Sequence, residues 1–201
     1  MTNAIHAERF AALFKGYSKA FGTYDARTLG GKGKQKPQYL SVKQSPNISN
    51  FERHLSGKKP IGIYVLDDND KVSFAAIDID EYPIDHSGIS SKLKSWGLPL
   101  VVCNSKSGGA HLYVFFSQQE DPSAVVTALE SIATALGYSG TEIFPKQTSR
   151  DKPNSLGNFI NLPFFGHPML IYYCWDGEHQ LDLEGFLALA EANLTSISEL
   201  E

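Results

Sequence analysis

The chain has 201 residues, of which 42% are hydrophobic and 20% are charged, and its formal net charge is −4. These values are ordinary for a globular protein of one domain, or of one domain with an added lobe, and they exclude a largely disordered chain. The negative net charge also excludes a globally basic nucleic-acid-binding protein, so any site for a polyanion must be a local patch.

Over residues 1–60, residue patterns predict two helices, a long loop and a strand. Apolar residues recur at helical spacing over 4–15, and a second helix is expected over 48–55. Between these helices, a loop rich in glycine and lysine spans 16–36 and a strand spans 38–43.

Over residues 61–201 the expected order of elements is β-β-α-β-β-α-β-β. Strands over 60–66 and 72–80 flank the turn sequence Asp67-Asp68-Asn69-Asp70, which predicts a β-hairpin. The other expected elements are helices over 87–96, 122–136 and 183–194 and strands over 98–103, 110–116, 141–145, 158–163 and 169–175. This order indicates an α+β fold with a largely antiparallel sheet and helices that return over one face.

The sequence predicts a cytoplasmic protein with no membrane partner. No apolar run approaches the ~18–20 residues of a membrane span. The start MTNAIHAERFAALF carries charges where a signal peptide needs an apolar core. Cys103 and Cys174 lie in apolar runs and form no C-x-x-C pair, which is typical of buried thiols in a reducing compartment.

The predicted strand SFAAIDID, Ser73–Asp80, carries two carboxylates at its end. Because strand side chains alternate, Asp78 and Asp80 point to one face and Ile77 and Ile79 to the other. Two carboxylates on one face suit a divalent Mg²⁺ or Mn²⁺, which prefers carboxylate, water and phosphate oxygens. Taken alone, such a pattern is more often an acidic strand end that runs into solvent.

A second informative stretch, NSKSGGAHLYVFF over 104–116, joins two predicted strands. Adjacent glycines allow a tight turn that exposes backbone N–H groups. Ser105, Lys106 and Ser107 add a charge and two hydroxyls, and His111 begins the next strand with Tyr113 on its face. The residues that would form such a phosphate cradle are Lys106, Ser107, Gly108, Gly109 and His111. The alternative is a glycine hairpin with a structural histidine.

A third stretch, EIFPKQ over 142–147, precedes GNFINLPFFG over 157–166. Glu142 could complete a metal site with the two aspartates, and Lys146 could meet a phosphate. The alternative is an edge-strand glutamate with a solvated lysine. Asn161 could simply satisfy turn backbone.

These motifs, in this order and spacing, resemble the catalytic core of the archaeo-eukaryotic primase superfamily, and most closely the primase-polymerases of mobile elements and of phage conflict systems. The upstream sequences YDARTLGGKGKQKPQYLSV and HLSGKKPIGIYVL are similar to that group as well, so the resemblance covers roughly residues 10–190. It implies an N-terminal α/β lobe over residues 1–60 and, over residues 61–201, an antiparallel palm like the RNA-recognition motif (RRM). Together these would form one DNA primase or DNA-directed polymerase domain.

The resemblance also implies a role for each motif. The metal carboxylates fall on Asp78 and Asp80, with the third on Glu142, and Lys146 lies near the triphosphate. The residues that contact the phosphates of the incoming nucleotide fall on Ser107, Gly108, Gly109 and His111. Many relatives have serine at the position of Gly109 and aspartate at that of Glu142. The zinc-binding cysteine cluster of some relatives cannot be built from two cysteines.

The expected reaction is template-directed joining of nucleoside triphosphates on single-stranded DNA. Two divalent ions ~3.5–4 Å apart would activate the attacking 3′-hydroxyl and neutralise the leaving pyrophosphate. Relatives of this kind often work beside a helicase. The given sequence has no G-x-x-x-x-G-K-[ST] motif. The chain could be an excised domain or a stand-alone subunit that works with a separate helicase.

Two other classes of function stay open. A metal-dependent nuclease or phosphodiesterase could use the same aspartates and histidine, and it would degrade nucleic acid without nucleoside triphosphates. A non-catalytic nucleic-acid-binding module with a degenerate palm would need a lost metal ligand, whereas Asp78 and Asp80 are both present.

The densest cluster of positive charge predicts the template path. Lys32, Lys34 and Lys36 lie in the glycine-containing loop, with Lys43 just beyond it. Tyr39 offers an aromatic surface on which a base could stack. The alternative is a solvated surface turn.

Overall fold

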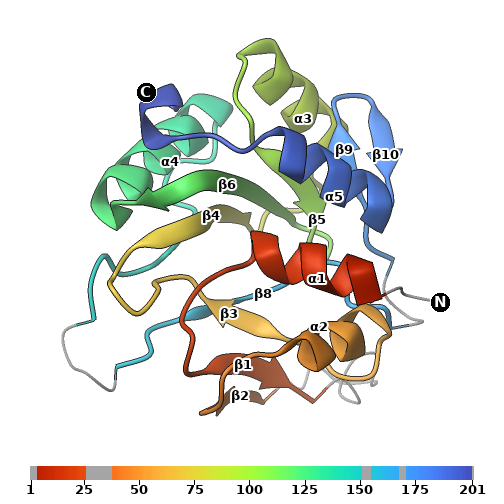
Figure 1. The fold of residues 1–201 in the computed structure, drawn as a ribbon. Coiled ribbons are helices and arrows are strands. Elements are labelled where there is room, and N and C mark those ends of the chain that lie inside the picture. The colour runs from red at the N-terminus through yellow and green to blue at the C-terminus, as the bar shows by residue number, and fades with distance from the viewer. Residues whose placement is uncertain (1–3, 26–37, 151–154, 168–170, 201) are drawn as a thin grey trace.

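The computed structural model describes residues 4–25, 38–150, 155–167 and 171–200, which form five α-helices and two antiparallel β-sheets (Figure 1). The helices are α1 (Ala4–Leu13), α2 (Ile48–Leu55), α3 (His86–Ser95), α4 (Pro122–Leu136) and α5 (Leu183–Ala192), and a short 3₁₀ turn covers Ile197–Glu199. In this part of the chain, no helix has the length and apolar character needed to cross a membrane.

The larger sheet has six strands in the order β10-β9-β5-β6-β4-β7. Its strands are β4 (Val72–Ile79), β5 (Val101–Asn104), β6 (Ala110–Glu120), β7 (Glu142–Phe144), β9 (Cys174–Asp176) and β10 (His179–Leu181). Helix α3 connects β4 to β5, and α4 connects β6 to β7, so each helical connection passes over one intervening strand. The central pair, β4 and β6, runs antiparallel with Asp78 opposite His111.

The smaller sheet has the order β2-β1-β3-β8. It consists of β1 (Phe21–Tyr24), β2 (Tyr39–Val42), β3 (Gly62–Tyr64) and β8 (Phe159–Asn161). Gly22 and Gly62 pair across β1 and β3, and the ring of Phe159 lies over both. A Cβ atom added at either glycine would lie 2.3 Å from that ring, so the ring can pack there only because both residues lack a side chain.

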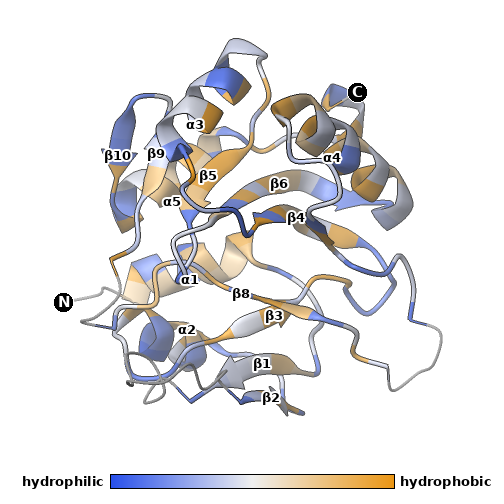
Figure 2. Cartoon of the chain, turned by 180° about the vertical axis from the view of Figure 1, so that it is seen from behind, coloured by the Kyte–Doolittle hydropathy of each residue, from blue (hydrophilic) through white to orange (hydrophobic). Residues whose placement is uncertain are grey.

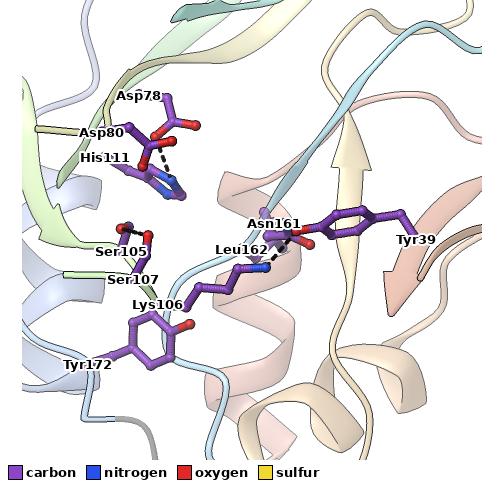
Figure 3. A pocket seen from close by; sticks show the side chains of 10 residues that line it. All are labelled: Tyr39, Asp78, Asp80, Ser105, Lys106, Ser107, His111, Asn161, Leu162 and Tyr172. Carbon is purple, nitrogen blue, oxygen red and sulfur yellow. Dashed lines mark hydrogen bonds and ion pairs between the residues drawn. The ribbon is translucent and has the colours of Figure 1, made fainter. Parts of the chain in front are cut away.

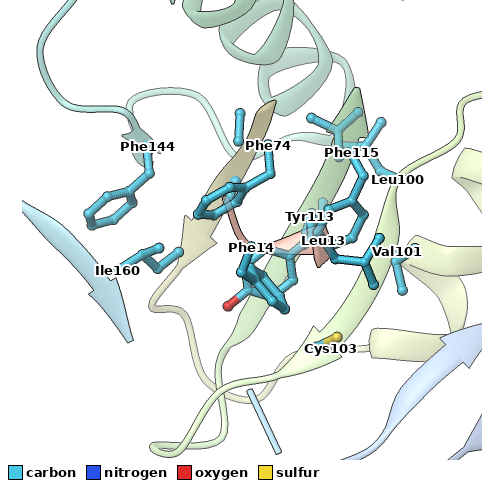
Figure 4. Close-up of a cluster of buried hydrophobic side chains, with 14 of the residues drawn as sticks. Leu13, Phe14, Phe74, Leu100, Val101, Cys103, Tyr113, Phe115, Phe144 and Ile160 are labelled. Atoms are coloured by element: carbon cyan, nitrogen blue, oxygen red, sulfur yellow. The ribbon is translucent and has the colours of Figure 1, made fainter. Parts of the chain in front are cut away.

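Helix α1 joins the two sheets (Figure 1). Phe10 faces α2, with its ring 6.4 Å from Phe51, whereas Phe14 packs edge-on against Phe74, Tyr113 and Phe115 of the larger sheet (Figure 4). Helices α3 and α4 cover the opposite face of that sheet, and the central strands β4, β5 and β6 carry many buried hydrophobic residues between these layers (Figure 2). Both faces of the larger sheet are therefore covered.

The α+β class, the antiparallel sheets and the helix over 122–136 are confirmed. The sequence patterns did not predict β1 or β10. The strand expected over 169–175 is limited among the described residues to β9, and residues 168–170 lie outside them. The division into lobes at residue 60 stays a prediction.

The hairpin expected between 60–66 and 72–80 is wrong. The turn itself forms, because Asp67 Oδ1 accepts hydrogen bonds from the backbone N–H groups of Asn69 (2.8 Å) and Lys71 (2.9 Å). The strands on either side then diverge: β3 pairs with β1 and β8, whereas β4 pairs with β6 and β7. The turn sequence fixes the local reversal but not the strand partners.

Candidate active site

A pocket of about 130 Å³ opens between the two sheets, and most of its lining is polar (Figure 3). The larger sheet contributes residues from the end of β4, the start of β6 and the loop between β5 and β6, and the smaller sheet contributes residues from β2 and β8. The lining consists of Tyr39, Asp78, Asp80, Ser105, Lys106, Ser107, His111, Asn161, Leu162 and Tyr172.

Asp78 and Asp80 both line the pocket, as the alternation of strand side chains predicts. Asp80 follows the last residue of β4, and its Oδ1 accepts a hydrogen bond of 3.1 Å from the hydroxyl of Tyr82. Asp78 lies deeper, with 18% of its side chain exposed. Its buried Oδ1 has no hydrogen-bond partner, which leaves an unmet acceptor that suits a cation.

His111 lies directly across the ladder from Asp78, with its Nε2 3.1 Å from Asp78 Oδ1 (Figure 3). This pair has the distance of an ion pair but lacks hydrogen-bond geometry. On the other side of the ring, Nδ1 lies 2.9 Å from the hydroxyl of Tyr113, and that hydroxyl lies 3.3 Å from the backbone oxygen of Asn161. Burial, more than the nearby Cys103 and Asp78, raises the pKa of Tyr113 well above its usual value, so its phenol stays protonated.

The loop Ser105–Gly109 turns as its glycines require. Gly108 has a φ of 95°, and a Cβ atom on Gly109 would lie 2.3 Å from the backbone oxygen of Ile79. The N–H groups of Ser105 and Gly108 are used within the loop, at 2.8 and 3.1 Å. These two amides are therefore not free for an anion, whereas the hydroxyls of Ser105 and Ser107, 3.1 Å apart, line the pocket.

Lys106 extends from this loop to the smaller sheet. Its ammonium group donates a 2.7 Å hydrogen bond to the hydroxyl of Tyr39 and lies 4.5 and 5.0 Å from the ring centres of Tyr24 and Tyr39 (Figure 3). Tyr24 and Tyr39 pair across β1 and β2. A lysine held between two aromatic faces keeps a positive charge at the pocket wall opposite the aspartates.

Glu142 and Lys146 lie outside the pocket lining. Glu142 is opposite Asp78 on the neighbouring strand, but its side chain is 59% exposed and its carboxylate lies 2.6 Å from the ammonium of Lys146. In the described residues, no three His, Cys, Asp or Glu side chains gather closely enough to hold a metal ion. The role of Glu142 as a third ligand stays a prediction.

Of the residues predicted to bind the template, one lines the pocket. Tyr39 lines the pocket and is 49% exposed, whereas Lys43 is exposed just beyond β2 and does not line it. Lys32, Lys34 and Lys36 fall outside the described residues. They belong to the connection that leaves β1 at Tyr24 and re-enters β2 at Tyr39.

Three lining residues were not predicted from the sequence, namely Asn161, Leu162 and Tyr172. Ser105 was expected beside Ser107 in the glycine loop, and it lines the pocket. Tyr113 was expected on the same face of the strand as His111, and its hydroxyl lies next to His111 Nδ1. Asn161 reaches the pocket through the pairing of β8 with β3, which local patterns do not reveal. Its side-chain oxygen is buried and has no hydrogen-bond partner.

Comparison with protein-family models gives a match that covers most of the chain. The family model for the archaeo-eukaryotic primase domain of the TOTE conflict system matches residues 3–170. This range contains every residue that lines the pocket except Tyr172. Comparison with curated proteins gives no match.

Proposed function

The chain belongs to the family of archaeo-eukaryotic primase domains found in TOTE conflict systems, and from this premise we propose that it is a primase-polymerase. It would join nucleoside triphosphates on a single-stranded DNA template. The order of β4, α3, β5, β6, α4 and β7, with neighbours β5-β6-β4-β7, supports an RRM-like palm as its catalytic core.

One observation carries the proposal: a small polar pocket has carboxylates on one wall and a lysine held by aromatic rings on the other. Asp78 and Asp80 supply negative charge, and Lys106 supplies positive charge at the β2 side. A nucleoside triphosphate with its bound cation needs both kinds of partner. A nuclease binds no nucleoside triphosphate, so it has less use for a lysine on the wall opposite the metal-binding carboxylates.

The donor set fits a divalent cation. Mg²⁺ is commonly held by one or two carboxylates together with water and substrate phosphates, so it does not need a closed cage of protein ligands. Asp78, with its unmet buried oxygen, and Asp80 would hold Mg²⁺ or Mn²⁺, and Glu142 is the candidate third ligand. When bound, the metal would acidify the attacking 3′-hydroxyl and offset the charge that develops on the leaving pyrophosphate.

The other side chains would bind and orient the nucleotide. His111 Nε2 and the hydroxyls of Ser105 and Ser107 lie on the aspartate side of the pocket, where they can donate to phosphate oxygens. Lys106 would bind the triphosphate as a point charge, and Lys146 would reach it only after leaving Glu142. Tyr39, at the pocket mouth, would stack against a base of the template or primer.

Primer extension tests this proposal directly. The protein is incubated with single-stranded template, Mg²⁺ or Mn²⁺ and labelled ribo- or deoxynucleotides, with and without a primer. Wild-type protein should make template-dependent product, and Asp78→Asn or Asp80→Asn should lower the rate on the order of a hundredfold or more. Glu130→Gln, an exposed position on α4, is the charge-matched control and should keep full activity.

Two outcomes would contradict the proposal. One is wild-type protein that cleaves the template and never incorporates a nucleotide, which would favour a nuclease. The other is an Asp78→Asn variant that extends primers as fast as the control.

A further inference from the structure

Tyr172 lines the pocket, although it lies beyond residue 170, where the match to the family model ends. Family membership therefore assigns it no role. In the close view of the pocket its ring lies beside Lys106, with the hydroxyl directed toward the interior (Figure 3). Within the residues that the structure describes, no group forms a hydrogen bond with this hydroxyl. The phenol is thus a polar group at the pocket wall that the fold itself does not use.

Asn104 holds the backbone on both sides of Tyr172. Its Nδ2 donates a hydrogen bond to the backbone oxygen of Ile171 (2.7 Å), and its Oδ1 accepts one from the N–H of Tyr173 (2.8 Å). The backbone N–H of Asn104 also donates to the backbone oxygen of Tyr173 (3.2 Å). Asn104 is buried at the end of β5, so these bonds tie the segment around Tyr172 to the larger sheet. A group held in place before a ligand binds loses less entropy in the contact.

The chemistry of this wall suits an anionic oxygen. Burial, more than the nearby Tyr24, raises the pKa of Tyr172 above its usual value, so the hydroxyl keeps its proton and can donate it. The ammonium of Lys106 has three hydrogens, of which one is used by the hydroxyl of Tyr39. An oxygen that accepts hydrogen bonds from both a phenol and an ammonium is best satisfied when it carries negative charge.

We propose that Tyr172 is a further ligand-binding residue, whose hydroxyl donates a hydrogen bond to a phosphate oxygen that also contacts Lys106. The pocket volume of about 130 Å³ is well below the ~300–1,000 Å³ of typical small-molecule sites, so the pocket suits phosphates and their cation and leaves a base outside. This inference rests on the proposed function for the identity of the ligand, a nucleoside triphosphate.

Tyr172→Phe tests the contact with little change to the fold. The variant keeps the ring, whose centre lies 6.3 Å from that of Phe164, and it removes a hydroxyl that no described residue binds. Tyr173→Phe is the matched control, because this adjacent tyrosine packs edge-on against Trp175 and does not line the pocket. Urea unfolding should give both variants the stability of the wild-type protein.

The decisive measurement is calorimetric titration in the presence of Mg²⁺ with two ligands. One is a nucleoside triphosphate, and the other is inorganic tripolyphosphate, which has no sugar or base. Tyr172→Phe should bind both ligands about tenfold more weakly than wild type, or weaker still, as for the loss of a hydrogen bond to a charged group. Tyr173→Phe should bind both with wild-type affinity.

The inference is overturned if Tyr172→Phe binds tripolyphosphate as tightly as wild type. A loss for the nucleoside triphosphate alone would place the hydroxyl at the sugar or the base. An equal loss in Tyr173→Phe also overturns the inference, because both effects would then come from loosening of the fold.

Failure of the proposed function gives a different result. If wild-type protein binds tripolyphosphate but neither binds nor joins nucleoside triphosphates, the proposed function fails, whereas the tripolyphosphate titrations still decide the role of Tyr172. If wild-type protein binds neither ligand, both proposals are overturned.

Discussion

Two buried acceptors at the pocket are left without a hydrogen bond, namely Oδ1 of Asp78 and Oδ1 of Asn161. A buried polar atom with no partner costs about 1–3 kcal/mol, and folded proteins rarely keep one without a use. These two atoms come from different sheets and border the same cavity. A ligand that brings a cation to Asp78 and a donor to Asn161 would satisfy both.

Glu142 can be tested at this scale by comparing two ways of breaking its ion pair with Lys146. Glu142→Gln removes the carboxylate, whereas Lys146→Met removes only its partner. If Glu142 is a metal ligand, Glu142→Gln should raise the metal concentration for half-maximal activity about tenfold or more, and Lys146→Met should not raise it. Metal-activation curves for Mg²⁺ and Mn²⁺ measure this.

If both variants change the metal concentration for half-maximal activity equally and only slightly, Glu142 and Lys146 form a surface salt bridge with no role in metal binding. Such exposed pairs contribute about 0–1 kcal/mol to stability. The metal site would then consist of Asp78 and Asp80 alone.

Among single residues, those predictable from the sequence are the ones whose position depends on one strand. The two-residue period put Asp78 and Asp80 on one face, and the glycine turn placed Ser107 and His111 near them. Asn161 and Tyr172 come from segments brought in by tertiary pairing. A single sequence contains no local signal for that pairing.

At the scale of elements, the turn residues and helix boundaries were predictable because their causes are local. Asp121 caps α4 by accepting hydrogen bonds from the N–H groups of Ser123 (3.0 Å) and Ala124 (3.4 Å), and Gly137 ends the helix with a φ of 97°. Strand β3 shows the limit of such signals. Its pairing with β1 and β8 depends on two glycines and a phenyl ring that are far apart in sequence.

Gly62→Ala tests that pairing. The new methyl group would overlap the ring of Phe159, which must move, and overpacking of this kind costs about 1–3 kcal/mol. Phe159 also contacts Tyr39 at the pocket mouth, with ring centres 5.9 Å apart. We therefore expect a lower free energy of unfolding in urea together with weaker binding of single-stranded DNA.

Gly97→Ala is the control for the intrinsic cost of replacing a glycine. Gly97 has a φ of 72°, and an added Cβ would have no neighbour within 4 Å, so its cost is backbone strain alone. A Gly62→Ala variant with wild-type stability and DNA affinity would show that the packing of the Phe159 ring does not require glycine at position 62.

On the scale of the whole molecule, His54 joins α2 to the segments that precede β3 and follow β8. Its Nδ1 accepts a hydrogen bond from the N–H of Ile61 (3.2 Å), so its Nε2–H donates to the backbone oxygen of Pro163 (2.7 Å). The ring is completely buried. Burial lowers the pKa of His54 to about 4, and the bond to Pro163 only partly opposes this effect.

The protein should therefore lose stability in mild acid. A histidine whose folded pKa lies below its unfolded value of about 6.5 stabilises the fold fully above pH 6.5 and loses this contribution as the pH falls toward 4. Between pH 7.5 and pH 5 the loss should be about 2 kcal/mol in the free energy of unfolding. Urea unfolding at several pH values measures it.

The comparison variant is His54→Gln, which has no titrating ring. Its stability should be lower than wild type at pH 7.5 and should approach wild type as the pH falls. His179→Gln, at an exposed position, should follow the wild-type curve. Parallel curves for wild type and His54→Gln would show that His54 is not the group responsible.

Binding of a single-stranded template depends on where positive charge gathers, because a protein of net charge −4 must concentrate its positive charge to hold a phosphate backbone. The proposed contact is made by Lys32, Lys34 and Lys36, in the connection between Tyr24 and Tyr39, the two residues whose rings hold Lys106. Replacing all three lysines by alanine should weaken binding of single-stranded DNA for every sequence alike. The slope of log affinity against log salt should shrink by about 0.7 for each lost contact.

The matched control is the triple change Lys58→Ala, Lys59→Ala and Lys92→Ala, at exposed positions outside the pocket lining. Both triple variants lose the same charge, so a purely global electrostatic effect would weaken them equally. A template path along the connection between β1 and β2 requires a larger loss of affinity and a flatter salt slope in the first variant only. If the two variants bind single-stranded DNA with the same affinity, the template binds to another surface. Substitutions of exposed residues around Tyr39, which lines the pocket, would then be the next to test.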